Sequence, residues 1–440
     1  MLSLIGFATI LVIVVLLLTG KVSPIIGLVL VPIAGALAAG FGITEIGAFF
    51  SDGIVKVLGV VTMFIFAILY FGLMNDVGLF DPLINRMIAF TRGNIISVCL
   101  GTVLIGAVAH LDGSGATTFL IAMPPLLPLY QRLRMSPYLL MLLVSTSAAV
   151  INLVPWGGPL GRAAAVLKMD PVALWRPLIP LQVIAMILML GMAVILGLRE
   201  KRRIARMAKA SVGDADGDAT TSDLAPAHAP SAALARPGLL WFNSLLTVVM
   251  LVFLVWGVVP SELTFMVAAS IALAVNFPNA KDQMSRIKAH APNALLMAAI
   301  LLAAGSFLGI LDGTAMLTAI ATDAVGIMPH AMSQDLHLWV GIFGIPIELL
   351  LNTDAFFFAL MPVVEKIVQG SGVDPVAAAY PMIIGKVTGT FVCPLAPAVW
   401  LALGIGNLDM GKHLRYSFFW VWGFSLILLG VAWLMGLFAL

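Results

Sequence analysis

Residues 152–159 have the sequence NLVPWGGP and interrupt an apolar stretch that otherwise runs from 137 to 166. A second apolar stretch, 376–405, is interrupted by TGTFVCPLAP at 388–397. Proline removes a backbone donor and glycine weakens a helix, so each stretch is predicted to form two half-helices joined by irregular backbone. Inside a membrane, such backbone is tolerated only where it is buried in protein or lines a cavity. The two interruptions therefore predict an internal site.

The composition places these interruptions in a lipid-embedded chain. Of 440 residues, 61% are hydrophobic and 10% are charged, against roughly a quarter charged in soluble domains. Several apolar runs reach the length of about 20 residues that a helix needs to cross a bilayer. Runs such as 2–18 and 178–198 are continuous, without the alternation of a barrel strand. An all-α membrane protein is predicted, and the net charge of +2 gives no reason to expect nucleic acid as a partner.

The longest hydrophilic stretch, 199–237, divides the chain into a first unit, 1–198, and a second unit, 238–440. Its tract rich in Asp, Ala, Thr and Pro predicts a flexible linker. The stretch begins with a basic cluster: Arg199, Lys201, Arg202, Arg203, Arg206 and Lys209. Because Lys and Arg favour cytoplasmic loops, the linker is predicted to lie in the cytoplasm and both termini outside.

About ten transmembrane spans are predicted, five in each unit. They lie near 3–20, 24–42, 57–75, 137–166 and 176–198, and near 239–257, 260–277, 292–311, 376–405 and 415–438. Two further apolar segments, about 94–131 and 336–370, carry polar residues at their centres. We predict that they are re-entrant hairpins, which enter and leave the membrane on the same side, with tips near the midplane.

An internal repeat relates the two units. Residues 114–159 align over 352–397 without a gap, which brings prolines into register at 124 and 362, at 137 and 375, and at 159 and 397. Since a unit of five spans ends on the side opposite its start, the second unit is predicted to be inverted relative to the first. Inverted repeats with broken helices at a midplane site are typical of secondary transporters.

The two hairpin tips and the two breaks supply the candidate site. Each exposes the amides of a half-helix amino terminus, which attract carboxylates. Arg162 and Lys386 are candidates for a substrate carboxylate, and Asp112 and Asp354 for a divalent cation or a proton, because charges at membrane depth are costly unless paired or functional. Two alternatives without a binding role stay open. In one the prolines only kink helices, and in the other the four charges only pair with one another.

The remaining substrate-binding candidates lie at the same interruptions, and each offers a hydroxyl, an amide, an aromatic ring or exposed backbone. They are Ser114, Gly115, Thr117, Thr118, Asn152, Trp156, Gly157, Gly158, Asn352, Thr353, Thr388, Thr390, Pro394 and Ala396. The hydroxyls and amides are equally expected to cap their own helices. Glu348 is a candidate proton carrier or a carboxyl facing a neighbouring helix, whereas Asp76 and Asp312 are expected to be solvated helix caps.

These motifs resemble those of a known family. LDG at 111–113 with Thr117 and Thr118, VPWGGP at 154–159, NTD at 352–354 and PLAP at 394–397 are similar to the bacterial metal-citrate/proton symporter family, CitMHS, of the ion transporter superfamily. The resemblance implies uptake of citrate complexed with Mg²⁺ or Ca²⁺, driven by protons across the bacterial inner membrane. It also implies a homodimer with a fixed scaffold and a mobile transport part, an elevator mechanism and no permanently bound cofactor.

Ser114 stands where family members carry an acidic residue. This departure leaves two questions open: which metal is preferred, and whether the cargo is a free or a metal-bound carboxylate. A sodium-coupled di- or tricarboxylate transporter is the alternative within the same class. A membrane-embedded enzyme is the alternative from another class, but the chain has no H-E-x-x-H motif and its six histidines are scattered. A channel is disfavoured because nothing in the sequence predicts a ring of pore helices.

Overall fold

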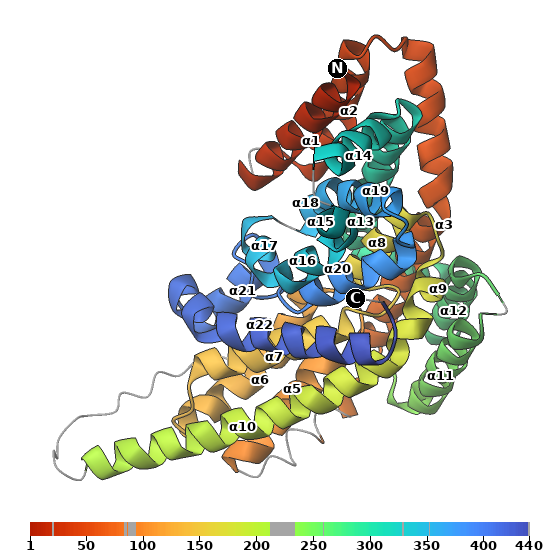
Figure 1. Ribbon diagram of the computed structural model, residues 1–440. Coiled ribbons are helices and arrows are strands. Elements are labelled where there is room, and N and C mark those ends of the chain that lie inside the picture. The colour runs from red at the N-terminus through yellow and green to blue at the C-terminus, as the bar shows by residue number, and fades with distance from the viewer. Residues whose placement is uncertain are drawn as a thin grey trace.

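The computed structural model describes residues 1–19, 22–82, 86, 94–211, 234–257, 259–327, 330–351 and 353–438, and these contain helices and no strand. The first unit has α1 (Leu2–Thr19), α2 (Pro24–Ala38), α3 (Ile43–Asp76), α5 (Ile95–Ala109), α6 (Gly115–Arg132), α7 (Pro137–Ile151), α8 (Gly158–Leu167), α9 (Pro171–Trp175), η1 (Arg176–Leu178) and α10 (Ile179–Ser211). Figure 1 shows α10 extending beyond the rest of the molecule at the lower left.

The second unit follows the same order with more irregular helices. It has η2 (Pro237–Leu239), α11 (Leu240–Trp256), α12 (Ser261–Asn276), α13 (Ala280–Gly313), α14 (Met316–Ile327), α15 (His330–Gln334), α16 (Leu336–Ile342), α17 (Gly344–Leu350), α18 (Thr353–Ala355), η3 (Phe356–Leu360), α19 (Met361–Gly370), α20 (Pro375–Val387), α21 (Pro397–Gly406) and α22 (Met410–Leu434). The helices α2, α3, α6 and α7 begin at 24, 43, 115 and 137, and their counterparts begin at 261, 280, 353 and 375. The offset is 237 residues for the first two pairs and 238 for the last two, which extends the alignment of the repeat to helix boundaries. The inversion of the units stays a prediction.

Five helical segments are long and apolar enough to cross a membrane: Ile43–Asp76, Pro171–Met207, Pro237–Trp256, Ala280–Gly313 and Met410–Leu434. Six shorter apolar helices, α1 and α2 among them, accompany these five in the described part of the chain. Several apolar helices are thus present, as the composition predicts, and the number of about ten spans stays a prediction.

Two helices that lead into the breaks lie in the interior of the molecule. Every residue from Leu139 to Val150 on α7 and from Ala378 to Val387 on α20 is buried. The helix α20 packs against α16, α17, α19 and α22 and also against α8 of the first unit. The irregular backbone that follows each helix therefore starts inside protein, which is the environment such backbone requires in a membrane.

Several predicted elements differ from the helices of the structure. The hydrophilic stretch predicted to connect the units begins at 199, but α10 continues through its basic cluster to Ser211, because Arg, Lys, Ala and Met are strong helix formers. The tract predicted to be flexible follows this cluster, and residues 212–233 lie outside the described part. The spans predicted at 57–75 and 292–311 belong to longer helices, 43–76 and 280–313, and α14 and α15 occupy a segment where no helix is predicted. The first limb of the predicted second hairpin is divided between two short helices, α16 and α17.

The long helices α3 and α13 approach each other through glycines. A Cβ atom on Gly53 of α3 would lie 2.7 Å from the Cα of Gly309 on α13, well inside van der Waals contact. The contact joins the two units along helices of 34 residues each. Close packing of small residues is a principal attraction between helices in lipid, where the hydrophobic effect gives none.

We expect Gly53→Ala to lower the thermal stability of the purified protein, because the added methyl must push α3 away from α13, at a cost of about 1–3 kcal/mol. Gly47→Ala is the matched control, since no atom lies within 4 Å of a Cβ at that position of the same helix. Alanine at 47 should leave stability unchanged or raise it by about 1 kcal/mol through helix propensity. Equal melting temperatures for the two variants would contradict the close contact.

Candidate functional site

All the predicted interruptions with described residues are breaks in helical structure. The helix α7 ends at Ile151 and α8 begins at Gly158, whereas α20 ends at Val387 and α21 begins at Pro397. The first hairpin turns between Ala109 and Gly115. In the second hairpin the turn falls between Leu350 and Thr353, and the candidate Asn352 lies outside the described residues. Half-helix amino termini are therefore present at Gly115, Gly158 and Pro397.

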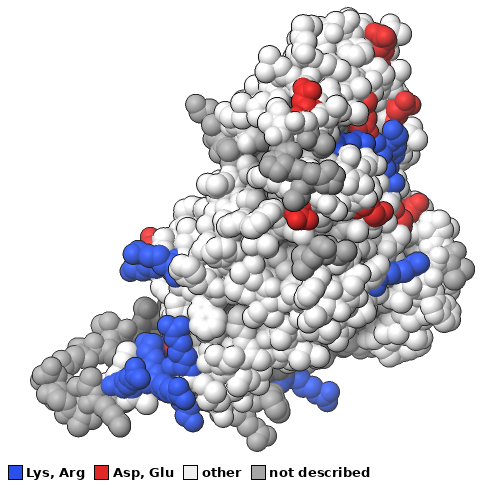
Figure 2. Space-filling view, in the orientation of Figure 1, with Lys and Arg blue, Asp and Glu red and all other residues white. Residues whose placement is uncertain are grey.

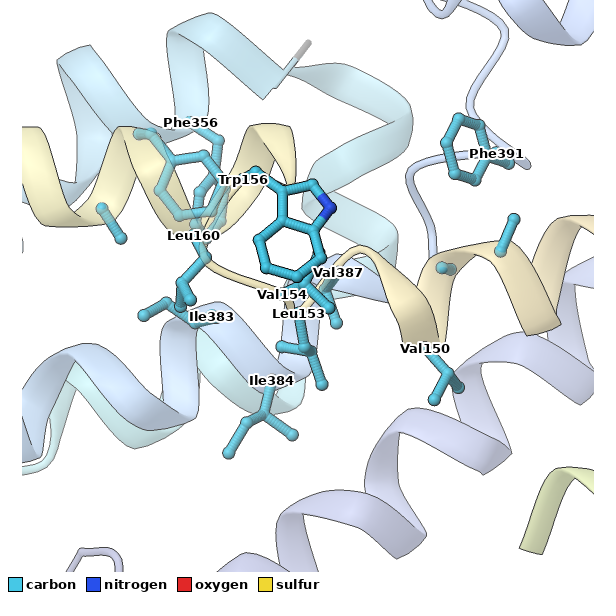
Figure 3. Close-up of a cluster of buried hydrophobic side chains, with 14 of the residues drawn as sticks. Val150, Leu153, Val154, Trp156, Leu160, Phe356, Ile383, Ile384, Val387 and Phe391 are labelled. Atoms are coloured by element: carbon cyan, nitrogen blue, oxygen red, sulfur yellow. The ribbon is translucent and has the colours of Figure 1, made fainter. Parts of the chain in front are cut away.

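Contacts join the first hairpin tip to both breaks. The indole Nε1 of Trp156 donates a hydrogen bond of 2.8 Å to the carbonyl of Leu111. A Cβ atom on Gly115 would lie 3.0 Å from the Cβ of Ala398 on α21. Figure 3 shows Trp156 standing on the loop of the first break, with Phe356 of the second hairpin on one side and Phe391 of the second break on the other. The predicted convergence of the interruptions is therefore present as direct packing.

A second set of contacts joins the second hairpin tip to the first break through charges. The guanidinium Nε of Arg162 lies 2.7 Å from Oδ1 of Asp354, and the two side chains are only 10% and 14% exposed. The residues come from α8 and α18, one in each unit. A buried ion pair is costly, because removing two charges from water costs several kcal/mol for each ion.

The same tip contacts the second break through another ion pair. Lys386 of α20 places Nζ 3.1 Å from Oε2 of Glu348, and neither side chain has more than 1% exposure. The Lys386 ammonium also donates to Oγ1 of Thr353 at 2.8 Å, and that hydroxyl donates to Oε1 of Glu348 at 3.3 Å. The thiol of Cys393 donates to the Glu348 carbonyl at 2.9 Å. Glu348 is thus tied to the break on both its main chain and its side chain.

The charged candidates pair in a way that the sequence leaves open. Arg162 pairs with Asp354, Lys386 pairs with Glu348, and within the described ranges no cation forms an ion pair with Asp112. The Asp112 carboxylate is half-buried and accepts a hydrogen bond of 2.8 Å from the amide of Ser114. The alternative that the four candidates only pair among themselves is therefore wrong for Lys386 and Asp112. Arg162 and Asp354 do pair with each other.

Several hydroxyls bond to nearby backbone groups, and one of them caps its helix, as the alternative without a binding role expects. Ser114 is the N-cap of α6 and accepts from the amide of Thr117 at 3.3 Å, and Thr118 is buried against the Ser114 carbonyl at 2.7 Å. Thr390 bonds the Val387 carbonyl at 2.8 Å. In contrast, the buried atoms Asn152 Oδ1 and Thr388 Oγ1 have no hydrogen-bond partner among the described residues.

Gly157 and Gly158 occupy positions in the first break where other atoms approach the backbone closely. A Cβ atom on Gly158 would lie 2.7 Å from Nη1 of Arg162, and a Cβ atom on Gly157 would lie 2.9 Å from the carbonyl oxygen of Val154. A side chain at 158 would therefore displace the guanidinium from its place above the helix amino terminus. Pro394 and Ala396 lie half-buried in the second break, where Ala396 is the N-cap of α21.

Two acidic residues expected to be solvated caps instead have partners. Asp76 at the end of α3 accepts from Nε2 of His290 at 2.8 Å and lies 3.5 Å from Nη1 of Arg286, both on α13. Asp312 at the end of α13 pairs with Lys168. The roles of His290 and Arg286 were missed because nothing in their local sequence indicates which helix they face. Glu348 could be identified as a candidate from the sequence, because it is the lone carboxylate in the apolar run 345–351.

Comparisons with known proteins relate the chain to transporters. Residues 6–385 match the family model described as a citrate transporter, CitMHS. The chain is 35% identical, over 99% of both chains, to the "Citrate transporter" of Bacillus subtilis. It is equally identical, again over 99% of both chains, to the "Mg(2+)/citrate complex secondary transporter" of the same organism. The crystal structure of the Alcanivorax borkumensis YdaH transporter shares the fold, with a TM-score of 0.58 and 15% identity, over 90% of this chain and 89% of that chain.

Proposed function

The chain belongs to the CitMHS citrate transporter family, and from this premise we propose that it imports citrate as a complex with a divalent cation, coupled to protons. The relatives are named as transporters and not as enzymes, and the apolar helices make the chain a multi-pass membrane protein.

The Arg162–Asp354 pair carries the proposal. It joins the half-helix starting at Gly158 to the second hairpin tip, with 2.7 Å between guanidinium and carboxylate. A metal-citrate complex presents carboxylate oxygens on one side and a cation on the other. Insertion of the complex between the two side chains would give Arg162 a carboxylate and Asp354 a cation, so both protein charges stay compensated. Oxygen ligands suit Mg²⁺ and Ca²⁺.

The divalent cation enters this proposal as part of the cargo. Among the described residues, no three His, Cys, Asp or Glu side chains are grouped so that they could hold a metal ion. A cation contacting Asp354 would therefore complete its coordination with citrate oxygens and water, which fits the reluctance of Mg²⁺ to lose its hydration shell. We assign the coupling proton to Asp112, whose half-buried carboxylate forms no ion pair within the described ranges.

The rest of the candidate set is proposed to surround the citrate. Lys386 would supply a second positive charge, although in the described state Glu348 neutralises it. The unpartnered Asn152 Oδ1 and Thr388 Oγ1 have hydrogen-bonding capacity for a citrate hydroxyl or carboxyl group. Backbone amides at the starts of the half-helices favour negative charge. The set is Ser114, Gly115, Thr117, Thr118, Trp156, Gly157, Gly158, Thr353, Thr390, Pro394 and Ala396, together with Asn352, which lies outside the described residues.

The proposal extends to the whole assembly. We propose two inverted units, 1–198 and 238–440, a cytoplasmic connection between them, both termini outside, and a location in the bacterial inner membrane. The recurring helix boundaries support the two units. The arginines at the end of α10 support its cytoplasmic placement. An elevator motion and a homodimer follow from the family resemblance.

Uptake of labelled citrate into proteoliposomes tests the function. We expect uptake only with an inward proton gradient and Mg²⁺ or Ca²⁺ present, and at least a 10-fold loss when the metal is chelated. An imposed sodium gradient at constant pH should drive none. Citrate uptake that ignores both the metal and the pH gradient would overturn the proposal. Uptake driven by sodium at constant pH would establish the sodium-coupled alternative instead.

A further inference from the structure

The end of α10 carries a basic face that the transport site does not use. Arg199 lies three and four residues before Arg202 and Arg203, and Arg206 lies four and three residues after them, so all four lie on one side of the helix. Figure 2 shows Lys and Arg gathered at the lower left of the molecule, where α10 extends in Figure 1. Four positive side chains on one face repel each other unless an anion lies among them.

These arginines line a surface cavity of about 790 Å³. Its other lining residues come from α10 itself and from the starts of α7 and α22: Ser136, Ile195, Leu198, Glu200, Met207 and Tyr416. The cavity therefore combines charged and apolar walls, and it lies away from the four interruptions that form the transport site.

One arginine builds the wall of the cavity. Arg203 donates from Nε to Oε2 of Glu200 at 3.0 Å and from Nη2 to Oε1 at 2.7 Å, and Nη2 also donates to the carbonyl of Arg134 at 2.7 Å. Glu200 is 4% exposed and accepts from the amide of Ser136 at 2.5 Å. The Arg203–Glu200 pair is therefore a fixed link between α10 and the start of α7. It leaves Arg203 little capacity for a ligand.

The charges of the other arginines are not neutralised by an ion pair within the described ranges. Arg202 and Arg206 are exposed, and no residue in the described ranges forms an ion pair or hydrogen bond with either guanidinium. Arg199 lies over the ring of Trp420, with 5.9 Å from its guanidinium carbon to the ring centroid. A single carboxylate, Glu200, thus faces four cationic groups in this cavity. The excess positive charge would attract a ligand with a phosphate or carboxylate group.

An apolar strip runs into the basic face from the membrane side. On α10, Ile187 is 62% exposed, Ile195 is 57% exposed and Leu198 is 41% exposed. A helix of 33 residues is about 50 Å long at 1.5 Å per residue, longer than the hydrocarbon core of about 30 Å. The last turns therefore reach the headgroup level when the apolar strip lies in the acyl chains. Tyr416 is of a residue type that concentrates at this level.

We propose that this cavity is a binding site for an anionic phospholipid. The phosphate would contact Arg202 and Arg206, and the acyl chains would follow Ile195 and Leu198 along α10. Free phosphate or citrate shares the anionic chemistry but leaves the apolar strip without a ligand. A lipid bound here bridges α10 and α22 through Tyr416, and it holds the end of α10 at the membrane surface.

Thermal stability of the purified full-length protein in detergent, with native mass spectrometry, tests the proposal. Phosphatidylglycerol should raise the melting temperature in a concentration-dependent way, and lipid-bound ions should persist. Phosphatidylcholine with the same acyl chains, inorganic phosphate and glycerol phosphate should each give a much smaller shift. The double variant R202Q/R206Q should lose at least 10-fold in phosphatidylglycerol affinity, whereas its citrate-induced thermal shift stays unchanged.

The matched control removes the same charge elsewhere. K281Q/K288Q replaces two exposed lysines on α13 and should bind phosphatidylglycerol as the wild type does. Equal stabilisation by inorganic phosphate would assign the cavity to a free anion and overturn the lipid site. Equal stabilisation by phosphatidylcholine, or equal loss of affinity in both double variants, would overturn it as well.

Discussion

Replacement of Asp354 by Asn is expected to reduce proton-driven uptake of metal-citrate by at least 100-fold, with the protein still folded. The amide keeps the size of the carboxyl group and can still accept a hydrogen bond from Arg162, which lies 2.7 Å away in the wild type. It cannot neutralise a divalent cation, so the proposed exchange of partners fails. A loss of 100-fold corresponds to about 2.7 kcal/mol at 1.36 kcal/mol per tenfold change. Initial rates in proteoliposomes measure it.

Asp374→Asn is the matched control for this variant. Asp374 caps α20 by accepting from the amides of Val376 and Ala377 at 2.9 and 3.0 Å. Asparagine caps helices equally well, so uptake should stay at the wild-type level. Size-exclusion chromatography and thermal melting would establish that both variants fold. Wild-type uptake by Asp354→Asn would remove this carboxylate from the transport site.

Replacement of Lys386 by Met is expected to destabilise the protein by about 3–5 kcal/mol, because it leaves Glu348 as an uncompensated buried charge. Both side chains are at most 1% exposed. Lys386 also contacts the Phe357 ring, 5.1 Å from Nζ to the centroid, so methionine fits the apolar part of its surroundings. The measurement is the midpoint of thermal unfolding in detergent. An unchanged midpoint would contradict the buried ion pair.

The double variant K386M/E348M separates stability from transport. Exchanging both members of a buried pair for apolar residues of similar volume is often neutral for stability, so the unfolding midpoint should return to within a few degrees of wild type. Citrate uptake should stay at least 10-fold reduced, because a positive charge proposed to face the cargo is missing. Full recovery of uptake would restrict this pair to a structural role.

Local sequence was sufficient to predict the breaks, because proline and glycine act on their own backbone. NLVPWGGP ends α7 at Ile151 and starts α8 at Gly158, and Pro397 starts α21. Alignment of the prolines at 137 and 375 also indicated the repeat, whose helix boundaries recur. The helix α10 extends through the basic cluster to Ser211, because the residues of the cluster favour a helix. The flexible tract predicted after the cluster lies largely outside the described residues and stays a prediction.

By itself the sequence determined that this chain is helical and apolar, with interrupted helices that carry Arg162 and Lys386 and hairpin tips that carry Asp112 and Asp354. Only the tertiary structure decided that Arg162 pairs with Asp354 and Lys386 with Glu348, and that His290 reaches Asp76. Composition and local pattern act within a few residues along the chain. Pairing of charges depends on which helices lie side by side, and packing between residues far apart in sequence sets that.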